Sequence, residues 1–436
     1  MPSQSKSNRT SLLLVAFVSA SIALIMGACG SPPVATPDGS RLFTGMKLID
    51  GTGRAPMDNA AMLVRDGRIE TIGPADDIPV PEGAEVISLT GKTVTPGFII
   101  THAHLSGVRG LEDGHYNEEN LMRQLRLYAR YGMTTVVSLG GDGPEAVALR
   151  DAQGADLDRA RVFLAGSVVT GESIEEVEKV VQENADLGAD FIKIRVDDNL
   201  GTTQKMPIEL ASAIIAKAHS LDLKVMAHVF YLDDAKALLE SGVDFIAHSV
   251  RDQEIDEEFI AAMKEKDVCY CPTLTREVST FVYGEVPEFF EDPFFLKEAD
   301  LEVLEQLKDP DRMRSVQESP AAAGYRAALD VAMANLTSAA DGGVRIAFGT
   351  DTGPAGRFQG YFEHMEMDMM AETGLSATDI VYSATGGAAS CLELDDLGKL
   401  VEGNWADFIV VDEDPSEDIS HMRAIASVWV SGNRVP

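Results

Sequence analysis

Two histidines one residue apart, His102 and His104, follow the apolar run Phe98–Ile100. Side chains two positions apart in a β-strand leave the same face, so both imidazoles point the same way. The run before them is apolar on both faces, which is typical of a strand buried in a parallel sheet. Two imidazoles at the end of such a strand predict half of a metal site, with two unrelated core or surface histidines as the alternative.

Four more residues that could bind a metal lie in or directly after other apolar runs: Lys193, His228, His248 and Asp351. A free ammonium at Lys193, between Ile192 and Ile194, would be costly to bury unless it were paired or neutralised. One solution is carboxylation of the lysine by CO2, which creates an anionic oxygen ligand able to bridge two cations. A lone histidine is more typical of a structural role, and an aspartate after a strand often caps a helix. Six ligand-type residues on five strands nevertheless predict a metal centre.

The segment 96–394 is expected to position these residues. Its apolar runs alternate with stretches of helical spacing, which predicts repeated βα units. Eight such units favour an α/β fold, a (β/α)8 TIM barrel with its chemistry at the C-terminal strand ends. The expected strands are Gly97–His104, Thr134–Gly140, Arg161–Val169, Asp190–Val196, Lys224–Phe230, Asp244–Val250, Val268–Leu274 and Arg345–Asp351. The stretch between the last two is expected to be mostly helical, with Phe289–Phe295 covering the mouth.

Short stretches in which apolar and polar residues alternate, interrupted by glycines, occupy residues 41–95 and recur in residues 395–436. The pair Asp66-Gly67 between two such runs is a strong hairpin signal. The ends of a domain often lie close together, so the two pieces predict one small β-sandwich domain built from both chain ends.

The N-terminal segment has the pattern of an export signal. Lys6 and Arg9 precede the apolar stretch Leu12–Ile25, which is short for a membrane span but suits a secretory signal. Residues 1–28 are therefore interpreted as a lipoprotein signal peptide, because Met26 to Cys29 resembles a bacterial lipobox. The resemblance implies a lipid anchor on Cys29 and a periplasmic or cell-surface location, and residues 29–40 are expected to form a tether.

The net charge limits the classes of molecule that can bind to the surface of this protein. The 436 residues hold 36 Lys+Arg against 70 Asp+Glu, a net charge of −34. Such a surface repels phosphate backbones and anionic lipid, so nucleic acid is excluded as a partner and the membrane is reached only through the anchor. The expected partner is a small-molecule substrate, and a homo-oligomer is compatible with the sequence.

The cysteines do not suggest a disulfide framework. With Cys29 lipidated, the remaining three, Cys269, Cys271 and Cys391, are scattered. Cys269 and Cys271 share a strand face and could chelate a metal, but small apolar core residues are the favoured interpretation.

The order His-x-His, Lys, His, His, Asp on strands one, four, five, six and eight resembles the amidohydrolase superfamily with a binuclear centre. The stretches IDGTG, VRDGRIETIG, GKTVTPGFI, GADFIKI, RIAFGTDTG and LGKLVEGNWADFIVV are similar to landmarks of that family. Within that family, these stretches are most similar to the imidazolonepropionase-like and Xaa-Pro dipeptidase-like branch. Imidazolonepropionase uses one metal and no lysine on strand four, so Lys193 favours the dipeptidase-like side. The chain departs from the family at Ile100, where an aspartate is usual.

The resemblance implies a mechanism with two divalent ions, most simply zinc for a nitrogen and oxygen ligand set. His102, His104 and Asp351 would hold one ion, His228 and His248 the second, and carboxylated Lys193 with a hydroxide would bridge them. The hydroxide attacks the substrate carbonyl, and Asp351 carries the proton to the leaving amine.

The favoured function is hydrolysis of an amide C–N bond in a dipeptide or N-acyl amino acid. Its carboxylate would need a receptor, and the candidate substrate contacts are Arg195, Tyr231, Arg251 and His115. The same scaffold could instead act on a lactone, a cyclic amide or a phosphoester. A third reading is a surface lipoprotein that binds a ligand without turnover, whose expected mark is a lost metal ligand; none is missing.

Overall fold

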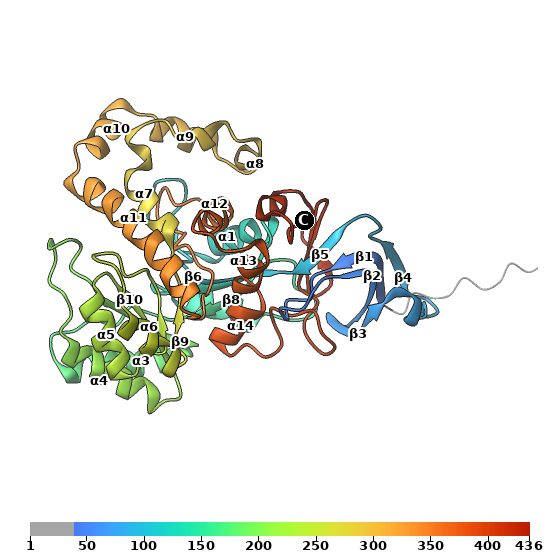
Figure 1. The fold of residues 1–436 in the computed structure, drawn as a ribbon, viewed down its shortest axis with the longest axis horizontal. Helices are drawn as coiled ribbons and strands as arrows, with labels where there is room; N and C mark the ends of the chain where they lie inside the picture. Colours follow the sequence, from blue (N-terminus) through green and yellow to red (C-terminus); the bar gives the residue numbers. More distant parts are fainter. Residues whose placement is uncertain (1–38) are drawn as a thin grey trace, which may run out of the picture. The chain divides into compact units, whose positions relative to one another are not determined.

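The computed structural model describes residues 39–436, in which alternating strands and helices build a barrel (Figure 1). Seven strands of the barrel pair in parallel, in two groups. The first group is β6 (Phe98–Ala103), β7 (Met133–Ser138) and β8 (Arg161–Leu164). The second is β9 (Phe191–Val196), β10 (Lys224–Val229), β11 (Phe245–Ile246) and β12 (Cys269–Tyr270).

Backbone hydrogen bonds join these groups into a ring. Between β8 and β9, the amide of Asp190 donates to the carbonyl of Leu164 at 2.7 Å. On the other side lie residues 345–352, called the eighth segment below. They form one bridge to β12, between Tyr270 and Ile346, and one to β6, between Ala103 and Thr352. The expected eighth strand therefore takes its place in the ring, but through isolated bridges rather than a regular ladder.

The later barrel strands are shorter than the apolar runs that predict them. The run Val268–Leu274 yields only β12, because Thr273 adopts a left-handed backbone with φ of 48° and Leu274 already begins a helix. The alternation of apolar residues reports which side chains are buried, and it does not report where the backbone leaves the ladder.

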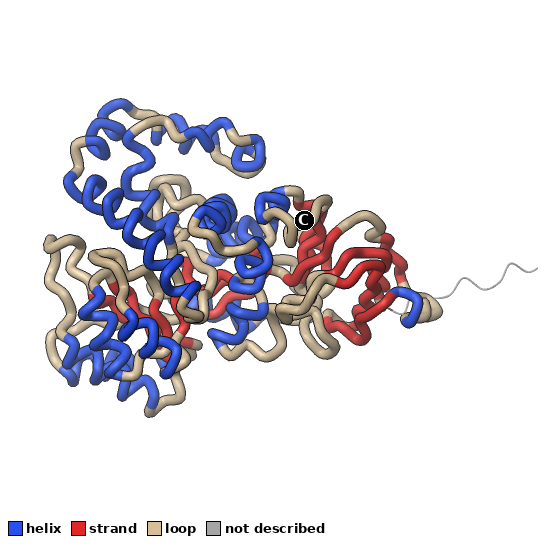
Figure 2. The backbone as a smooth tube through the Cα atoms, viewed as in Figure 1, coloured by secondary structure: helices blue, strands red, loops and turns tan. Residues whose placement is uncertain are grey.

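Helices follow the strands and cover the barrel (Figure 2). Those that follow β6 to β11 are α1 (Glu118–Arg130), α2 (Pro144–Asp151), α3 (Ile174–Leu187), α4 (Ile208–His219), α5 (Leu232–Ser241) and α6 (Glu257–Glu265). Three more follow the eighth segment: α12 (Tyr361–Glu372), α13 (Ala377–Ser383) and α14 (Gly386–Leu392). The predicted α/β architecture with repeated βα units is confirmed.

The stretch between β12 and the eighth segment is helical, as expected. It contains α7 (Leu274–Phe281), α8 (Pro293–Leu296), α9 (Leu301–Leu307), α10 (Pro310–Gln317) and α11 (Pro320–Asp341). Phe289, Phe290, Phe294 and Phe295 pack in one aromatic cluster with Tyr131, at the end of α1, and with Tyr361 and Phe362 of α12. This aromatic cluster anchors the helical stretch against the elements that carry the β6 and eighth-segment loops.

Both chain ends contribute to a single eight-stranded mixed sheet, as the two matching β regions predict. Its strands are β1 (Arg41–Leu48), β2 (Met57–Arg65), β3 (Arg68–Pro74), β4 (Glu85–Ser88), β5 (Thr93–Pro96), β13 (Phe408–Val411), β14 (Ile425–Val430) and β15 (Asn433–Arg434). Hydrogen bonds connect all eight strands, which is partly consistent with the predicted β-sandwich. β13 joins the halves by pairing antiparallel with β5.

One expectation about the cysteines is wrong. Cys269 of β12 and Cys391 of α14 form a disulfide, so Cys269 is neither a metal ligand nor a free core thiol. Their separation of 122 residues hides the pairing from local sequence patterns. Cys271 is free and buried, and its sulfur accepts a hydrogen bond from the hydroxyl of Thr101.

The predicted signal peptide, the lipid anchor on Cys29 and most of the tether lie outside the described residues. Within residues 39–436, no helix is both long enough and apolar enough to cross a bilayer.

Candidate metal centre

His102 and His104 lie at the C-terminal end of β6, where the eighth segment runs parallel to it at close range. A Cβ on Gly353 would lie 2.2 Å from the carbonyl oxygen of His104, and one on Gly349 would lie 2.9 Å from the amide nitrogen of His102. Only glycine permits this approach. The two glycines therefore allow Asp351 to reach the histidines, and ligand atoms of His102, His104 and Asp351 lie within 4.8 Å of one another.

Asp351 is held in a backbone conformation that non-glycine residues seldom adopt, with φ of 62°. The threonines on either side of it are fixed by Glu363 of α12, whose carboxylate accepts hydrogen bonds from the hydroxyls of Thr350, at 2.7 Å, and Thr352. Burial raises the pKa of Glu363 to about 7. The two hydrogen bonds to Glu363 therefore stabilise the backbone on both sides of Asp351.

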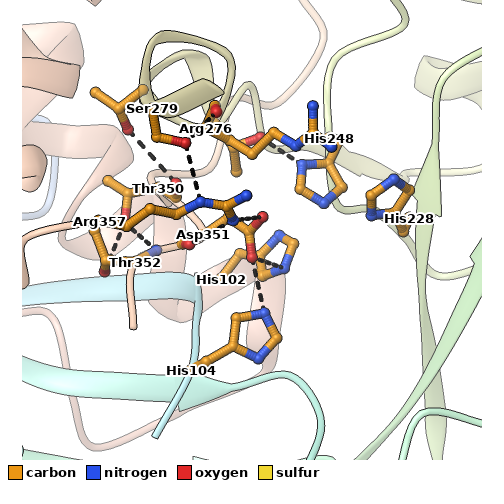
Figure 3. Close-up of polar contacts among 12 residues, drawn as sticks. His102, His104, His228, His248, Arg276, Ser279, Thr350, Asp351, Thr352 and Arg357 are labelled. Atoms are coloured by element: carbon orange, nitrogen blue, oxygen red, sulfur yellow. Dashed lines mark hydrogen bonds and ion pairs between the residues drawn. The ribbon is translucent and has the colours of Figure 1, made fainter. Parts of the chain in front are cut away.

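The barrel brings the four histidines into one cluster (Figure 3). The ring centroids of His102 and His248 lie 4.5 Å apart, and those of His228 and His248 lie 4.0 Å apart. The Nζ atom of Lys193 on β9 lies 3.1 Å from Nε2 of His102. All six residues that the sequence singles out therefore meet at one end of the barrel.

Each imidazole has one nitrogen bound to a partner outside the cluster. Nδ1 of His102 lies 2.6 Å from the carbonyl oxygen of Ala247, and Nδ1 of His248 lies 2.6 Å from the hydroxyl of Thr273. Nε2 of His228 lies 2.8 Å from a carboxylate oxygen of Asp197. An imidazole that donates through one nitrogen presents a lone pair on the other, which is the form that binds a metal.

The free nitrogens fit a metal ion. Nε2 of His248 is buried and has no hydrogen-bond partner among the described residues, which would be costly without a ligand. Nε2 of His104 lies 2.8 Å from Oδ1 of Asp351 while its Nδ1 faces the carbonyl of Gly140. The donor set of imidazoles, a carboxylate and Lys193 therefore suits divalent ions.

Burial keeps the cluster in the protonation states that metal binding needs. It lowers the pKa of His228 to about 3 and that of His248 well below its ordinary value, so both rings are neutral. Burial also lowers the pKa of Lys193 to about 7. For Asp351, burial opposes ionisation, but the charge of Arg357 and the hydrogen bond with His104 hold its pKa well below the ordinary range.

A cavity of about 260 Å³ opens onto this cluster. Its wall includes three arginines, of which Arg195 is a predicted substrate contact and Arg276 and Arg357 are not. Arg357 forms an ion pair with Oδ2 of Asp351 and donates from Nε to the hydroxyl of Ser279 at 3.0 Å (Figure 3). Sequence reasoning overlooks both new arginines because they lie in a helix start and a loop, where no periodic pattern marks them.

The other predicted substrate contacts lie away from this cavity wall. Arg251 is buried, where it donates to the carbonyl of Val229 at 2.8 Å and pairs with Glu277 at 2.9 Å. The hydroxyl of Tyr231 donates to Asp198 at 2.7 Å. His115 is partly exposed, 4.0 Å from Glu112. Arg251 is thus buried behind the cavity wall, and substrate contact by Arg251, Tyr231 and His115 stays a prediction.

Comparisons with known proteins agree with this geometry. The sequence model of the amidohydrolase family matches residues 93–435, most of the chain. The chain is 26% identical to ochratoxinase from Aspergillus niger, over 90% of this chain and 85% of that protein. It is 22% identical to imidazolonepropionase from Streptomyces coelicolor, over 86% and 92% of the two chains. A solved Xaa-Pro dipeptidase structure with bound methionine superposes with a TM-score of 0.70, at 24% identity over 91% of this chain and 99% of that one.

Proposed function

This chain belongs to the amidohydrolase family, as a metal-dependent hydrolase of carbon–nitrogen bonds, and we propose that its substrate is a dipeptide or an N-acyl amino acid whose amide bond it cleaves. The observation that carries this proposal is the cluster of four imidazoles, Asp351 and Lys193 beside one cavity. The solved relative with a bound amino acid is a dipeptidase by name, which supports the substrate class.

Two divalent ions are proposed, with zinc favoured by the donor set. His102, His104 and Asp351 would hold one, and His228 and His248 the other, with Lys193 between them. When bound, such ions lower the pKa of water and polarise a carbonyl oxygen.

Asp351 is proposed to move the proton. Its carboxylate is ionised and lies at the cavity wall, so it can accept a proton from the attacking water and donate it to the nitrogen of the leaving amine. Water then adds to the carbonyl carbon, the C–N bond breaks and the amine leaves with the transferred proton. Arg357 fixes the second oxygen of Asp351, so the carboxylate keeps one orientation during the transfer.

The arginines around the cavity favour a substrate that carries a carboxylate. Arg195, Arg276 and Arg357 all line it, and a guanidinium binds a carboxylate through two parallel hydrogen bonds. Arg276 is 6% exposed and already paired with Glu277 at 2.9 Å, so it is fixed in place before a ligand arrives. Arg195 is the proposed receptor because its side chain is 39% exposed, although its guanidinium also contacts Asp197 and Asn199.

Carboxylation of Lys193 is also proposed. Lys193 is 3% exposed and its amine lies 3.1 Å from Nε2 of His102, where an anionic oxygen ligand would suit two cations better than an ammonium. The reaction joins the neutral amine to CO2 and releases one proton. Incubation with ¹³C-labelled bicarbonate and zinc should give a carbamate carbon signal by NMR in the wild type and none in Lys193→Ala.

A substrate screen tests the function directly. Zinc-loaded protein would be assayed with N-acyl amino acids, Xaa-Pro dipeptides, lactones and phosphotriesters, each with and without a chelator. Hydrolysis of the first two classes that the chelator abolishes supports the proposal. Turnover confined to lactones, cyclic amides or phosphotriesters would replace it with that chemistry on the same site, and binding without any turnover would indicate a ligand-binding protein.

We further propose that the protein is exported and lipid-anchored on Cys29. The Cys269–Cys391 disulfide supports an oxidising compartment, since such bonds are rare in the cytosol. Expression in a bacterium with labelled palmitate should label the wild type. The Cys29→Ser variant should be unlabelled and released from the membrane fraction.

A further inference from the structure

Two consecutive carboxylates after β9 reach across to the end of the neighbouring strand β10. Asp197 contacts the ring of His228, and Asp198 accepts the hydroxyl hydrogen of Tyr231 at 2.7 Å. β9 and β10 pair in parallel register, with Arg195 opposite His228, so the loop after β9 passes directly over the end of β10.

The Asp197 carboxylate is fixed at both oxygens. Oδ2 lies 2.8 Å from Nε2 of His228, and Oδ1 accepts the backbone amide of Asn199 at 2.9 Å. This hydrogen bond from the amide two residues further on is an Asx turn, and the backbone is left-handed at Asn199, with φ of 53°. The side chain of Asp197 is fully buried. Asp197 therefore has little freedom to release His228.

The contact determines which nitrogen of His228 carries the hydrogen. One oxygen of the Asp197 carboxylate accepts the backbone amide of Asn199, and the other lies 2.8 Å from Nε2 of His228. A carboxylate offers acceptor atoms only, so Nε2 carries the hydrogen and Nδ1 carries the lone pair. His102 and His248 have the opposite arrangement, since each is bound outside the cluster through Nδ1.

We propose that Asp197 is a positioning residue that holds His228 in the Nε2–H tautomer and so directs the Nδ1 lone pair to the metal. The inference rests on the proposed metal-dependent function. A carboxylate behind a ligating imidazole fixes the ring and raises its basicity, and loss of such a partner typically weakens metal affinity about 10- to 100-fold. Asp197 lies in the loop after β9, the neighbour of the strand that carries His228, so the local sequence around His228 does not predict this contact.

Three variants test the proposal by metal affinity, measured by competition with a chromophoric chelator. Asp197→Ala should weaken one of the two zinc equivalents about 10- to 100-fold and leave the other near the wild-type value. Asp197→Asn keeps the volume and one acceptor oxygen but loses the charge, so its zinc affinity should lie between that of the wild type and that of Asp197→Ala. The matched control is Asp198→Asn, which removes the adjacent carboxylate of the same loop and should change neither equivalent more than about 3-fold.

A second readout separates positioning from general damage to the fold. In metal-free protein, ¹⁵N NMR of the histidine rings should show His228 as the Nε2–H tautomer in the wild type and in Asp198→Asn, and a mixture in Asp197→Ala. Unchanged tautomer and affinity in Asp197→Ala would overturn the inference while the wild type still binds two zinc ions. A wild type that binds no zinc would overturn the proposed function itself. Equal losses in Asp197→Asn and Asp198→Asn would assign the effect to the loop.

Discussion

Single side chains at the metal centre are each fixed by a partner that does not depend on a ligand. Thr273 holds His248, the carbonyl of Ala247 holds His102, and Arg357 holds Asp351. Fixed ligands bind with less loss of conformational freedom, and they also exclude geometries that suit other chemistry. The site is therefore organised before substrate enters.

Replacing Asp351 by asparagine tests its role at the residue scale. The amide keeps the shape but neither accepts the proton nor carries the charge, so we expect kcat to fall by about 10²- to 10⁴-fold. Steady-state kinetics on the best amide substrate of the screen would measure the loss. Asp311→Asn, the same chemical change at an exposed position on α10, serves as the control and should leave kcat unchanged. Undiminished turnover in Asp351→Asn would remove the proposed proton transfer.

The buried carboxyl group of Glu366 makes stability depend on pH. Burial raises its pKa from 4.5 to about 7, although it accepts hydrogen bonds from the amides of Leu274 and Thr275. Between pH 4.5 and 7 the folded state binds more protons than the unfolded state, so the unfolding free energy falls as pH rises through this window. Urea unfolding at pH 5 and pH 8 should show a fall on the order of 1–3 kcal/mol larger in the wild type than in Glu366→Gln. Parallel pH profiles would contradict it.

Sequence patterns predict the strands of this barrel better than the loops that complete the site. The apolar runs of β6, β9 and β10 predict the strands and the positions of their histidines and lysine well, because burial on both faces leaves a continuous apolar signature. The eighth segment is found by its sequence but is not a regular strand. What the sequence cannot predict is the partner of each ligand. Asp197, Thr273 and Arg357 reach the site through turns whose geometry depends on the assembled barrel.

The disulfide between β12 and α14 is an element-scale constraint. It closes a loop of 122 residues, and removal of a native disulfide typically lowers the unfolding free energy by about 2–5 kcal/mol. Thermal unfolding of the Cys269→Ser, Cys391→Ser double variant should show a lower Tm than the wild type. Addition of dithiothreitol should lower the Tm of the wild type and leave that of the variant unchanged. A wild type insensitive to the reductant would contradict this expectation.

On the scale of the whole described molecule, a buried ion pair joins the barrel to the end sheet. Arg161 of β8 donates to Asp407, just before β13, at 2.6 Å, with side chains 3% and 5% exposed. The guanidinium also lies 4.3 Å from the ring of Trp405. The pair links the barrel to the end sheet, and because both side chains are buried, water is not available to hydrogen-bond to either one if its partner is lost.

Breaking this pair should be costly. Arg161→Met fills the space but leaves Asp407 buried without its cation, so we expect a loss of about 3–5 kcal/mol in unfolding free energy. The exposed pair of Arg314 and Asp311 gives the control, because Arg314→Met should cost no more than about 1 kcal/mol. Denaturant unfolding followed by tryptophan fluorescence would measure both. Equal small losses would show that the barrel and the end sheet do not depend on this link.

The pairing of β5 with β13 has a consequence for how the protein is made. A ribosome delivers β5 long before β13, and until then the edge of β5 that later pairs with β13 exposes unpaired amides and carbonyls. Nascent chains that stop short of residue 408 would keep this edge open to other strands, so C-terminal truncations should be lost to aggregation even though every metal ligand precedes the cut.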